Sequence, residues 1–285
     1  MSGRPSLDST ALALLLALVV GQAILVSLVA TPGAHPGGDN AAYVSLADAL
    51  AEGEGYVERW EPGAPNHTKY PPVFSGLLAI LLAVGAERWV TLKLAAAAAG
   101  VVTVVATWLW ARKRLPEGLA AATALATGLS YTLLYHTRYI LSDVPFLAFT
   151  MLALWLLQPV REDTCALEPT PSTEPKNLPV PIFAAATLFV GLAYFTRSAG
   201  LPLLLAFLIA LAAAGAWRRL GASLAVLGIL AAWWNLRTGS EQGEYGSEFL
   251  LIDPYDPAAG RVGFGDLLAR IAANEMVFEL MRAGE

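Results

Sequence analysis

Long apolar runs decide what this chain can fold into. The first covers residues 11–30 and follows a short polar N-terminus that contains Arg4. About 20 apolar residues match the hydrocarbon thickness of a bilayer and exceed the apolar core of a signal peptide. We therefore expect residues 11–30 to form an uncleaved first membrane span with the N-terminus in the cytoplasm.

Composition agrees with a membrane protein and excludes several classes of function. Of the 285 residues, 56% are hydrophobic and only 14% are charged, unlike an average soluble domain. The net charge of -5 and the lack of a Lys/Arg stripe argue against nucleic acid as a partner. The single cysteine, Cys165, cannot form an internal disulfide, and C-x-x-C metal or redox spacings are absent.

The apolar run at residues 73–86 decides the predicted topology. At about 14 residues it is short for a span and typical of a re-entrant or interfacial segment. If it does not cross, the next run, 89–111, delivers Arg112, Lys113 and Arg114 to the cytoplasm. If it crosses, this basic cluster lies outside, against the positive-inside rule. We adopt the version in which it does not cross.

The resulting expectation is an all-α fold, a polytopic transmembrane helical bundle with a short re-entrant or juxtamembrane helix in its first outer loop. The expected spans, about seven of them by length and charge, are residues 11–30, 89–111, 118–135, 144–159, 181–196, 201–216 and 222–236.

Polar segments complete the expected domain organisation. A transmembrane domain covers residues 1–236, with the first outer loop at 31–88. Residues 160–179, rich in Pro, Thr and Glu, are typical of a disordered cytoplasmic linker. Residues 237–285 form an outer polar tail, where apolar side chains at helical spacing over 264–281 predict an interfacial helix.

The polar stretch at residues 37–72 is interpreted as an active-site loop. It contains Asp39, Tyr43, His67, Lys69 and Tyr70. Backbone without helix or sheet partners cannot lie in lipid, so this stretch lies outside the bilayer or against protein. Loops held by a rigid scaffold often contain functional residues. A plain connector is the alternative.

Ionisable residues from four separate places in the sequence reach one membrane face under this topology. They are Asp39, His67, Lys69, Arg138, Asp143 and Arg197. Such residues at the edge of membrane spans are costly and are functional candidates. The alternative for the arginines is snorkelling to the interface. For Asp143 it is helix capping, because Ser142 and Pro145 beside it favour a helix start.

Two carboxylates and several cations at a lipid–water boundary suit glycosyl transfer from a lipid-phosphate sugar. A carboxylate can act as general base on an acceptor hydroxyl or amine. Arg and Lys can stabilise a phosphate leaving group as its charge develops.

The order of motifs resembles a known family. The segments are GDNAAYVSLADALAEGEGY, KYPPVFSGLLAILLAVG, a span ending in WARKRL, YHTRYILSDVPFLAF, FTRSAGLPLLLAFL and WWNLRTG. Together they resemble the membrane GT-C glycosyltransferases related to protein O-mannosyltransferases and lipid A aminoarabinose transferases, which are similar to glycosyltransferase family 39. The resemblance covers most of the chain between residues 10 and 240.

The resemblance implies roles for the charged residues. Asp39 matches the catalytic base of the first outer loop, and Asp143 matches a second outer carboxylate that orients the acceptor or assists. Lys69 matches a donor-phosphate contact, and Arg138 and Arg197 would contact the donor phosphate or the acceptor.

Tyr43, His67 and Tyr70 are expected to complete the substrate-binding site. His67 has no counterpart in the family, and a hydrogen-bonded loop histidine is its alternative role. Asn40 follows Asp39 where many relatives have an acidic pair. Relatives also continue through more spans, so the chain looks C-terminally short.

The expected function is an inverting transferase at the outer face of the plasma membrane. Its partners would be a polyprenyl-phosphate-linked sugar, membrane lipid and a protein, lipid or glycan acceptor. No cofactor is required, although a divalent cation is compatible with the chemistry. The alternatives are a transporter or flippase component, and a truncated lipid-binding scaffold without turnover. Transporters tend to place ionisable groups at mid-membrane on broken helices within repeated halves, and neither feature is visible in the sequence.

Overall fold

A computed structural model of the chain describes residues 9–34, 39–85, 89–158 and 178–238, together with parts of 251–269. The chain divides into two compact units, residues 1–234 and 235–285. Each unit is described by itself.

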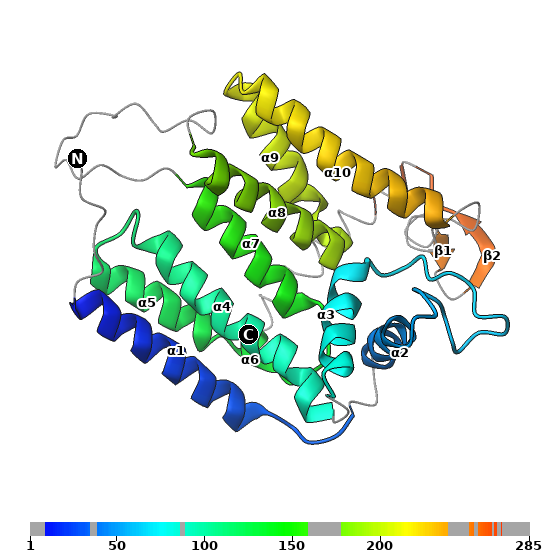
Figure 1. Cartoon of the computed structure of the whole chain (residues 1–285), viewed down its shortest axis with the longest axis horizontal. Helices are drawn as coiled ribbons and strands as arrows, with labels where there is room; N and C mark the ends of the chain where they lie inside the picture. The colour runs from blue at the N-terminus through cyan, green and yellow to red at the C-terminus, as the bar shows by residue number, and fades with distance from the viewer. Residues whose placement is uncertain are drawn as a thin grey trace. The chain divides into compact units, whose positions relative to one another are not determined.

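The described part of the chain is mostly helical, as expected (Figure 1). The helices are α1 (Ser9–Val29), α2 (Asn40–Ala51), α3 (Pro72–Ala83), α4 (Trp89–Ala111), α5 (Glu117–Gly128), α6 (Tyr131–His136), α7 (Asp143–Leu157), α8 (Val180–Thr196), the 3-10 turn η2 (Ser198–Gly200), α9 (Leu201–Ala213) and α10 (Trp217–Thr238).

Two helices within the described ranges are long and apolar enough to cross a membrane, α1 and α4, with mean hydropathies of 2.7 and 1.9. The helices α3, α7, α8 and α9 are apolar but shorter. At about 1.5 Å per residue, a helix such as α7 is shorter than the roughly 30 Å of a bilayer core. The seven-span bundle is therefore not confirmed by helix length.

Two sequence expectations about secondary structure are wrong. The expected span at 118–135 is interrupted at Leu129 and Ser130, which separate α5 from α6. Gly128 and Ser130 favour this break because both are poor helix formers. The polar stretch at 37–72 also contains a helix, α2, whose buried side chains Tyr43, Leu46 and Ala47 follow helical spacing.

The helices of the first unit pack mainly around α4 and α7. The long helix α4 packs against α1 and α5, with Trp108 and Ala124 buried between them. The helix α7 lies between α4 and α8 (Figure 1). A further cluster joins α7, α8 and α9 around Phe207 and Val190.

Basic side chains donate hydrogen bonds to backbone carbonyls at one end of these helices. The ammonium group of Lys113, just after α4, donates to the carbonyls of Trp155 (2.8 Å) and Gln158 (3.2 Å) at the end of α7. Arg219 donates to the carbonyl of Leu178, just before α8. Cations at helix C-termini interact favourably with the last carbonyls. The ends of α4 and α7 therefore lie together, so these two helices run in the same direction.

The second unit contains two short antiparallel strands, β1 (Leu251–Asp253) and β2 (Asp256–Arg261). This hairpin departs from the all-α expectation. Most of the expected interfacial helix at 264–281 and of the expected linker at 160–179 lies outside the described residues.

Candidate active site

Asp39 lies directly before α2 with an exposed side chain. Its backbone carbonyl accepts the N–H of Tyr43 (3.0 Å), the first bond of the helix. The hydroxyl of Tyr70, just before α3, donates to Asp39 Oδ1 (2.7 Å). The start of α2 and the approach to α3 therefore hold the predicted base between them.

Tyr43 links this carboxylate to α7. Its ring is buried between Tyr70, with ring centroids 4.9 Å apart, and Phe74, at 5.0 Å. Its hydroxyl shares a hydrogen bond of 2.8 Å with Oγ of Ser142, the residue before α7. The two segments are 99 residues apart in sequence.

The electrostatics around Tyr43 show which charges surround it. Burial raises the pKa of Tyr43 to about 12, and the hydrogen bond with Ser142 opposes this rise. The negative charges of Asp39 and Asp143 raise the pKa further, and the positive charge of Arg197 lowers it. Both predicted carboxylates and one predicted arginine therefore lie within electrostatic reach of a single hydroxyl.

Asp143 and Arg197 form an ion pair across two helices, with 2.7 Å between Oδ2 and Nη1. Asp143 is the first residue of α7, and Arg197 follows the last residue of α8. The helix start predicted at Ser142, Asp143 and Pro145 is confirmed, because α7 begins at Asp143, but no side-chain cap bond forms there. Ser142 occupies the N-cap position without a side-chain cap bond, because its hydroxyl contacts Tyr43 and the Asp143 carboxylate faces Arg197.

A glycine makes the approach of Arg197 feasible. Arg197 leaves α8 in an extended conformation, and η2 then folds back so closely that a Cβ on Gly200 would lie 2.7 Å from Cα of Tyr194. Because a backbone neighbour cannot move aside cheaply, only glycine fits here. This turn fixes the backbone position from which the Arg197 side chain reaches Asp143.

The remaining predicted residues lie around this cluster in different surroundings. Lys69 precedes Tyr70, and its charge acts on Glu58. Arg138 follows α6, with its guanidinium 5.9 Å from the centre of the Tyr139 ring. His67 is buried, with 2% of its side chain exposed, and both ring nitrogens are engaged.

Several structural residues of the site were missed from the sequence. The side chain of Asn40 is buried, and its Oδ1 accepts the backbone N–H of Ile140 (2.7 Å), which ties α2 to the segment before α7. Lys93 in α4 donates to the carbonyls of Thr31 (2.7 Å) and Gly33 (2.8 Å), which fixes the chain after α1. The departure at Asn40 was visible in the sequence, but its partner 100 residues away was not.

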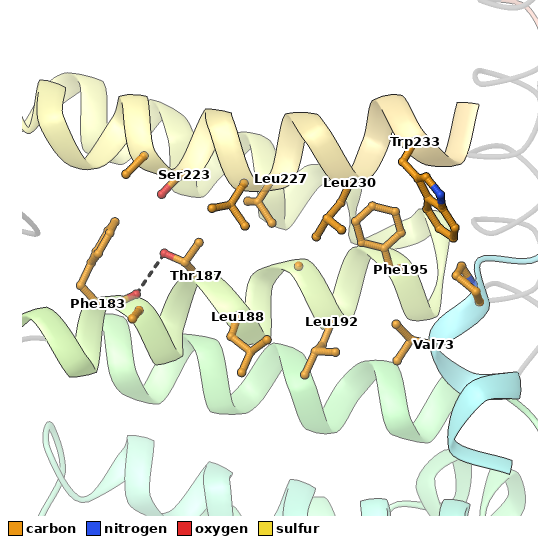
Figure 2. Close-up of a pocket in the computed structure, with 15 residues that line it drawn as sticks. Val73, Phe183, Thr187, Leu188, Leu192, Phe195, Ser223, Leu227, Leu230 and Trp233 are labelled. Carbon is orange, nitrogen blue, oxygen red and sulfur yellow. Dashed lines mark hydrogen bonds between the residues drawn. The ribbon is translucent and has the colours of Figure 1, made fainter. Parts of the chain in front are cut away.

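An apolar cavity of about 490 Å³ lies between α8 and α10, beside the start of α3 (Figure 2). Phe183 and Ser223 mark one end, and Val73, Phe195 and Trp233 mark the other. Leu188 and Val226 in its lining are 57% and 54% exposed, so it is a groove open along its side.

The second end of this groove is formed by residues that are close in sequence to the polar cluster. Pro72 in the lining follows Tyr70 by two residues, and Phe195 precedes Arg197 by two. The hydroxyl of Tyr56 donates to the carbonyl of Tyr70 (3.1 Å), and the Tyr56 ring is 5.9 Å from that of Trp234. A molecule with a polar end and an apolar tail could therefore contact both features at once.

Within the described ranges, no group of three or more His, Cys, Asp or Glu side chains is arranged to hold a metal ion. No protein-family model, curated protein or solved structure matches this chain.

Proposed function

We propose that this protein is a membrane glycosyltransferase of the GT-C type, which moves a sugar from a polyprenyl-phosphate donor to an acceptor at the outer face of the membrane. The observation that supports the proposal is the position of the polar cluster. Its members are Asp39, Tyr43, Tyr70, Asp143 and Arg197. Tyr70 and Arg197 are each two residues from a residue that lines the apolar groove, Pro72 and Phe195.

The helix surfaces support an apolar surrounding. The residues of α1 with exposed side chains include Leu12, Leu16, Val20, Ile24 and Leu28, which repeat every four positions, and the most hydrophobic stretch of this helix is only 11% buried. Apolar surface of this extent is unfavourable in water. We infer that α1, α4 and the shorter apolar helices lie in the bilayer as a multi-pass bundle.

The proposed reaction assigns roles to the groove, to Asp39 and to the basic residues. The polyprenyl chain lies in the groove, and Arg197, with Lys69 and Arg138, holds the phosphate. Asp39 removes the proton from the acceptor as the acceptor atom bonds to the anomeric carbon of the sugar. The bond from this carbon to the phosphate oxygen breaks, and the polyprenyl phosphate leaves with the bonding electrons. Arg197 stabilises the developing charge.

The test is transfer by the purified protein in lipid nanodiscs. A panel of radiolabelled polyprenyl-phosphate sugars would be offered with an extract of cell-envelope acceptors. Asp39→Asn keeps the shape of the side chain and removes its basicity, so we expect transfer to fall by about 10²- to 10⁴-fold. Glu61→Gln, which removes an exposed carboxylate from the same loop, is the matched control and should keep full transfer.

Two outcomes would contradict the proposal in different ways. Unchanged transfer by Asp39→Asn would remove this residue from the reaction. Saturable binding of the polyprenyl phosphate by a wild-type protein that transfers nothing would instead indicate a lipid-binding scaffold.

A further inference from the structure

The loop between α2 and α3 is a small hairpin with defined ends. Val57 pairs with Asn66 in an isolated antiparallel bridge. The N–H of Glu58 donates to the carbonyl of Pro65 (2.9 Å), and the N–H of His67 donates to the carbonyl of Tyr56 (2.9 Å). Glu58 and His67 therefore sit on facing sides of the hairpin, close to its base.

The surroundings of His67 define one tautomer. Its Nε2 lies 2.7 Å from the backbone nitrogen of Tyr70, and a backbone N–H can only donate, so Nε2 must be unprotonated. The proton of the neutral ring is then on Nδ1, which lies 2.7 Å from Glu58 Oε1 and donates to it. Both nitrogens are thus committed to the protein.

This arrangement excludes His67 as a proton carrier or a substrate ligand. Proton transfer through the ring would require a second titratable partner, and Nε2 faces a backbone amide instead. The side chain is also only 2% exposed. A different task must account for a buried histidine paired with a carboxylate.

That task is visible at Tyr70. The His67 ring stacks on the Tyr70 ring, with centroids 5.0 Å apart and an interplanar angle of 29°. The same histidine accepts the Tyr70 N–H, so it fixes both the backbone and the ring of this residue. The Tyr70 ring also contacts the Tyr43 ring, with centroids 4.9 Å apart, and its hydroxyl donates to Asp39 Oδ1 at 2.7 Å.

We propose that Glu58 and His67 form a positioning pair that orients Tyr70 and, through its hydroxyl, the Asp39 carboxylate. This inference rests on the proposed function, in which Asp39 is the base. Glu58 accepts a hydrogen bond from Nδ1 and so orients the His67 ring, His67 holds Tyr70, and Tyr70 holds Asp39. Neither Glu58 nor His67 touches the substrate, so both act on the rate of the chemical step rather than on donor binding.

The charged and aromatic groups around the pair fit this task. Lys69 and Glu61 act electrostatically on Glu58. The rings of Tyr56 and Trp60 meet the His67 ring edge-on, with centroids 5.4 and 6.0 Å away. The imidazole is therefore enclosed by rings on several sides, which limits its rotation.

The first experiment uses NMR to determine the protonation and hydrogen bonding of the His67 ring nitrogens. The protein contains three histidines, and ¹⁵N-labelled imidazole signals would be assigned with His67→Phe. In the wild type we expect His67 to show a protonated Nδ1 and an unprotonated Nε2. Glu58→Ala should shift the Nδ1 signal because Nδ1–H loses its hydrogen-bond acceptor, whereas Glu58→Gln should largely keep the wild-type signal because its amide oxygen can still accept from Nδ1–H.

A second label follows Tyr70. The ¹³Cζ signal of Tyr70, assigned with Tyr70→Phe, reports the hydrogen bond of its hydroxyl. We expect Asp39→Asn to move this signal, and Glu58→Ala and His67→Phe to move it in the same direction. Glu58→Gln should leave it in place. An unchanged Nδ1 signal and an unchanged Tyr70 signal in Glu58→Ala would overturn the positioning pair, whatever the transfer assay shows.

The second experiment measures transfer with the same variants. Misplacement of a catalytic group by about 1 Å can lower a rate by roughly 10²-fold, so Glu58→Ala and His67→Phe should lower kcat by up to that factor with little change in the KM for the lipid donor. Glu58→Gln should restore most of kcat. Equal kcat values in all variants would contradict the pair, whereas a wild type that transfers nothing would contradict the proposed function alone.

Discussion

At the residue scale, the contacts of Tyr43 show how the site is held together. Its hydroxyl shares a hydrogen bond with Ser142 before α7, and its ring packs against Tyr70 before α3 and Phe74 in α3. The charges of Asp39, Asp143 and Arg197 also act on it. A residue of this kind stabilises the geometry of its neighbours. Its own protonation state should then affect the stability of the fold.

The stability of the protein is expected to depend on Tyr43 at high pH. Burial raises its pKa from the ordinary 10.0 to about 12. Between these values the folded state binds more protons than the unfolded chain, so stability is unaffected below about pH 10 and falls as pH rises from about 10 to about 12. The full loss amounts to about 2–3 kcal/mol.

Denaturant unfolding of wild type and Tyr43→Phe at several values between pH 9 and 11.5 would measure this effect. Tyr43→Phe should lack this fall, because the titrating group has been removed. Tyr131→Phe, at a residue that is 77% exposed, is the control and should follow the wild type. Parallel curves for wild type and Tyr43→Phe would show that this hydroxyl does not titrate with unfolding.

Sequence reasoning at this scale found residues whose chemistry is recognisable by type. Asp39, Asp143 and Arg197 were chosen because ionisable groups beside membrane spans are costly, and the structure brings all three to Tyr43. Asn40 and Ser142 were not chosen as site residues, since a buried amide or hydroxyl matters only through a partner far away in the sequence. The roles of the predicted site residues stay predictions until transfer is measured.

At the element scale, long apolar runs predicted helices well. The run at 89–111 coincides with α4, and the run at 181–196 differs from α8 by one residue. The helix α2 was missed because the helical spacing of its buried residues, such as Tyr43 and Leu46, can be recognised only when their burial is known. The hairpin at β1 and β2 was missed because its few residues lie within a polar tail.

The groove between α8 and α10 should decide the affinity for the lipid part of the donor. Leu188 lines the groove and is 57% exposed, so Leu188→Trp can fill the groove without disturbing a packed core. Displacement of about two CH₂ groups, at roughly 0.8 kcal/mol each, should weaken binding of polyprenyl phosphate by about tenfold.

Competition binding with a fluorescent polyprenyl phosphate in detergent would measure this change. Leu205→Trp in α9, at a residue that is 49% exposed and outside the groove, is the matched control. Equal affinities for the two variants would place the lipid tail elsewhere on the helices.

At the scale of the whole first unit, the two ends of the helices differ in chemistry. One end holds Asp39, Asp143 and Arg197 with the starts of α2 and α7. At the other end Lys113 donates to backbone carbonyls at the C-terminal end of α7. Positive charge near span ends on the cytoplasmic side is the pattern that fixes topology in membrane proteins. The structure thus separates the two groups of charges that the sequence assigned to opposite sides.

If this separation corresponds to the two sides of the bilayer, thiol labelling in intact cells will reproduce it. On a Cys165→Ala background, we expect Glu61→Cys and Ser198→Cys to react with an impermeant reagent from outside, because both residues are exposed at the site end. Leu115→Cys and Ala213→Cys, exposed at the opposite end, should react only after permeabilisation. These substitutions alter no basic residue, so the positive-inside signal is preserved. Labelling of Leu115→Cys from outside would mean that α3 and α4 cross differently, and the outer-face transferase would have to be abandoned.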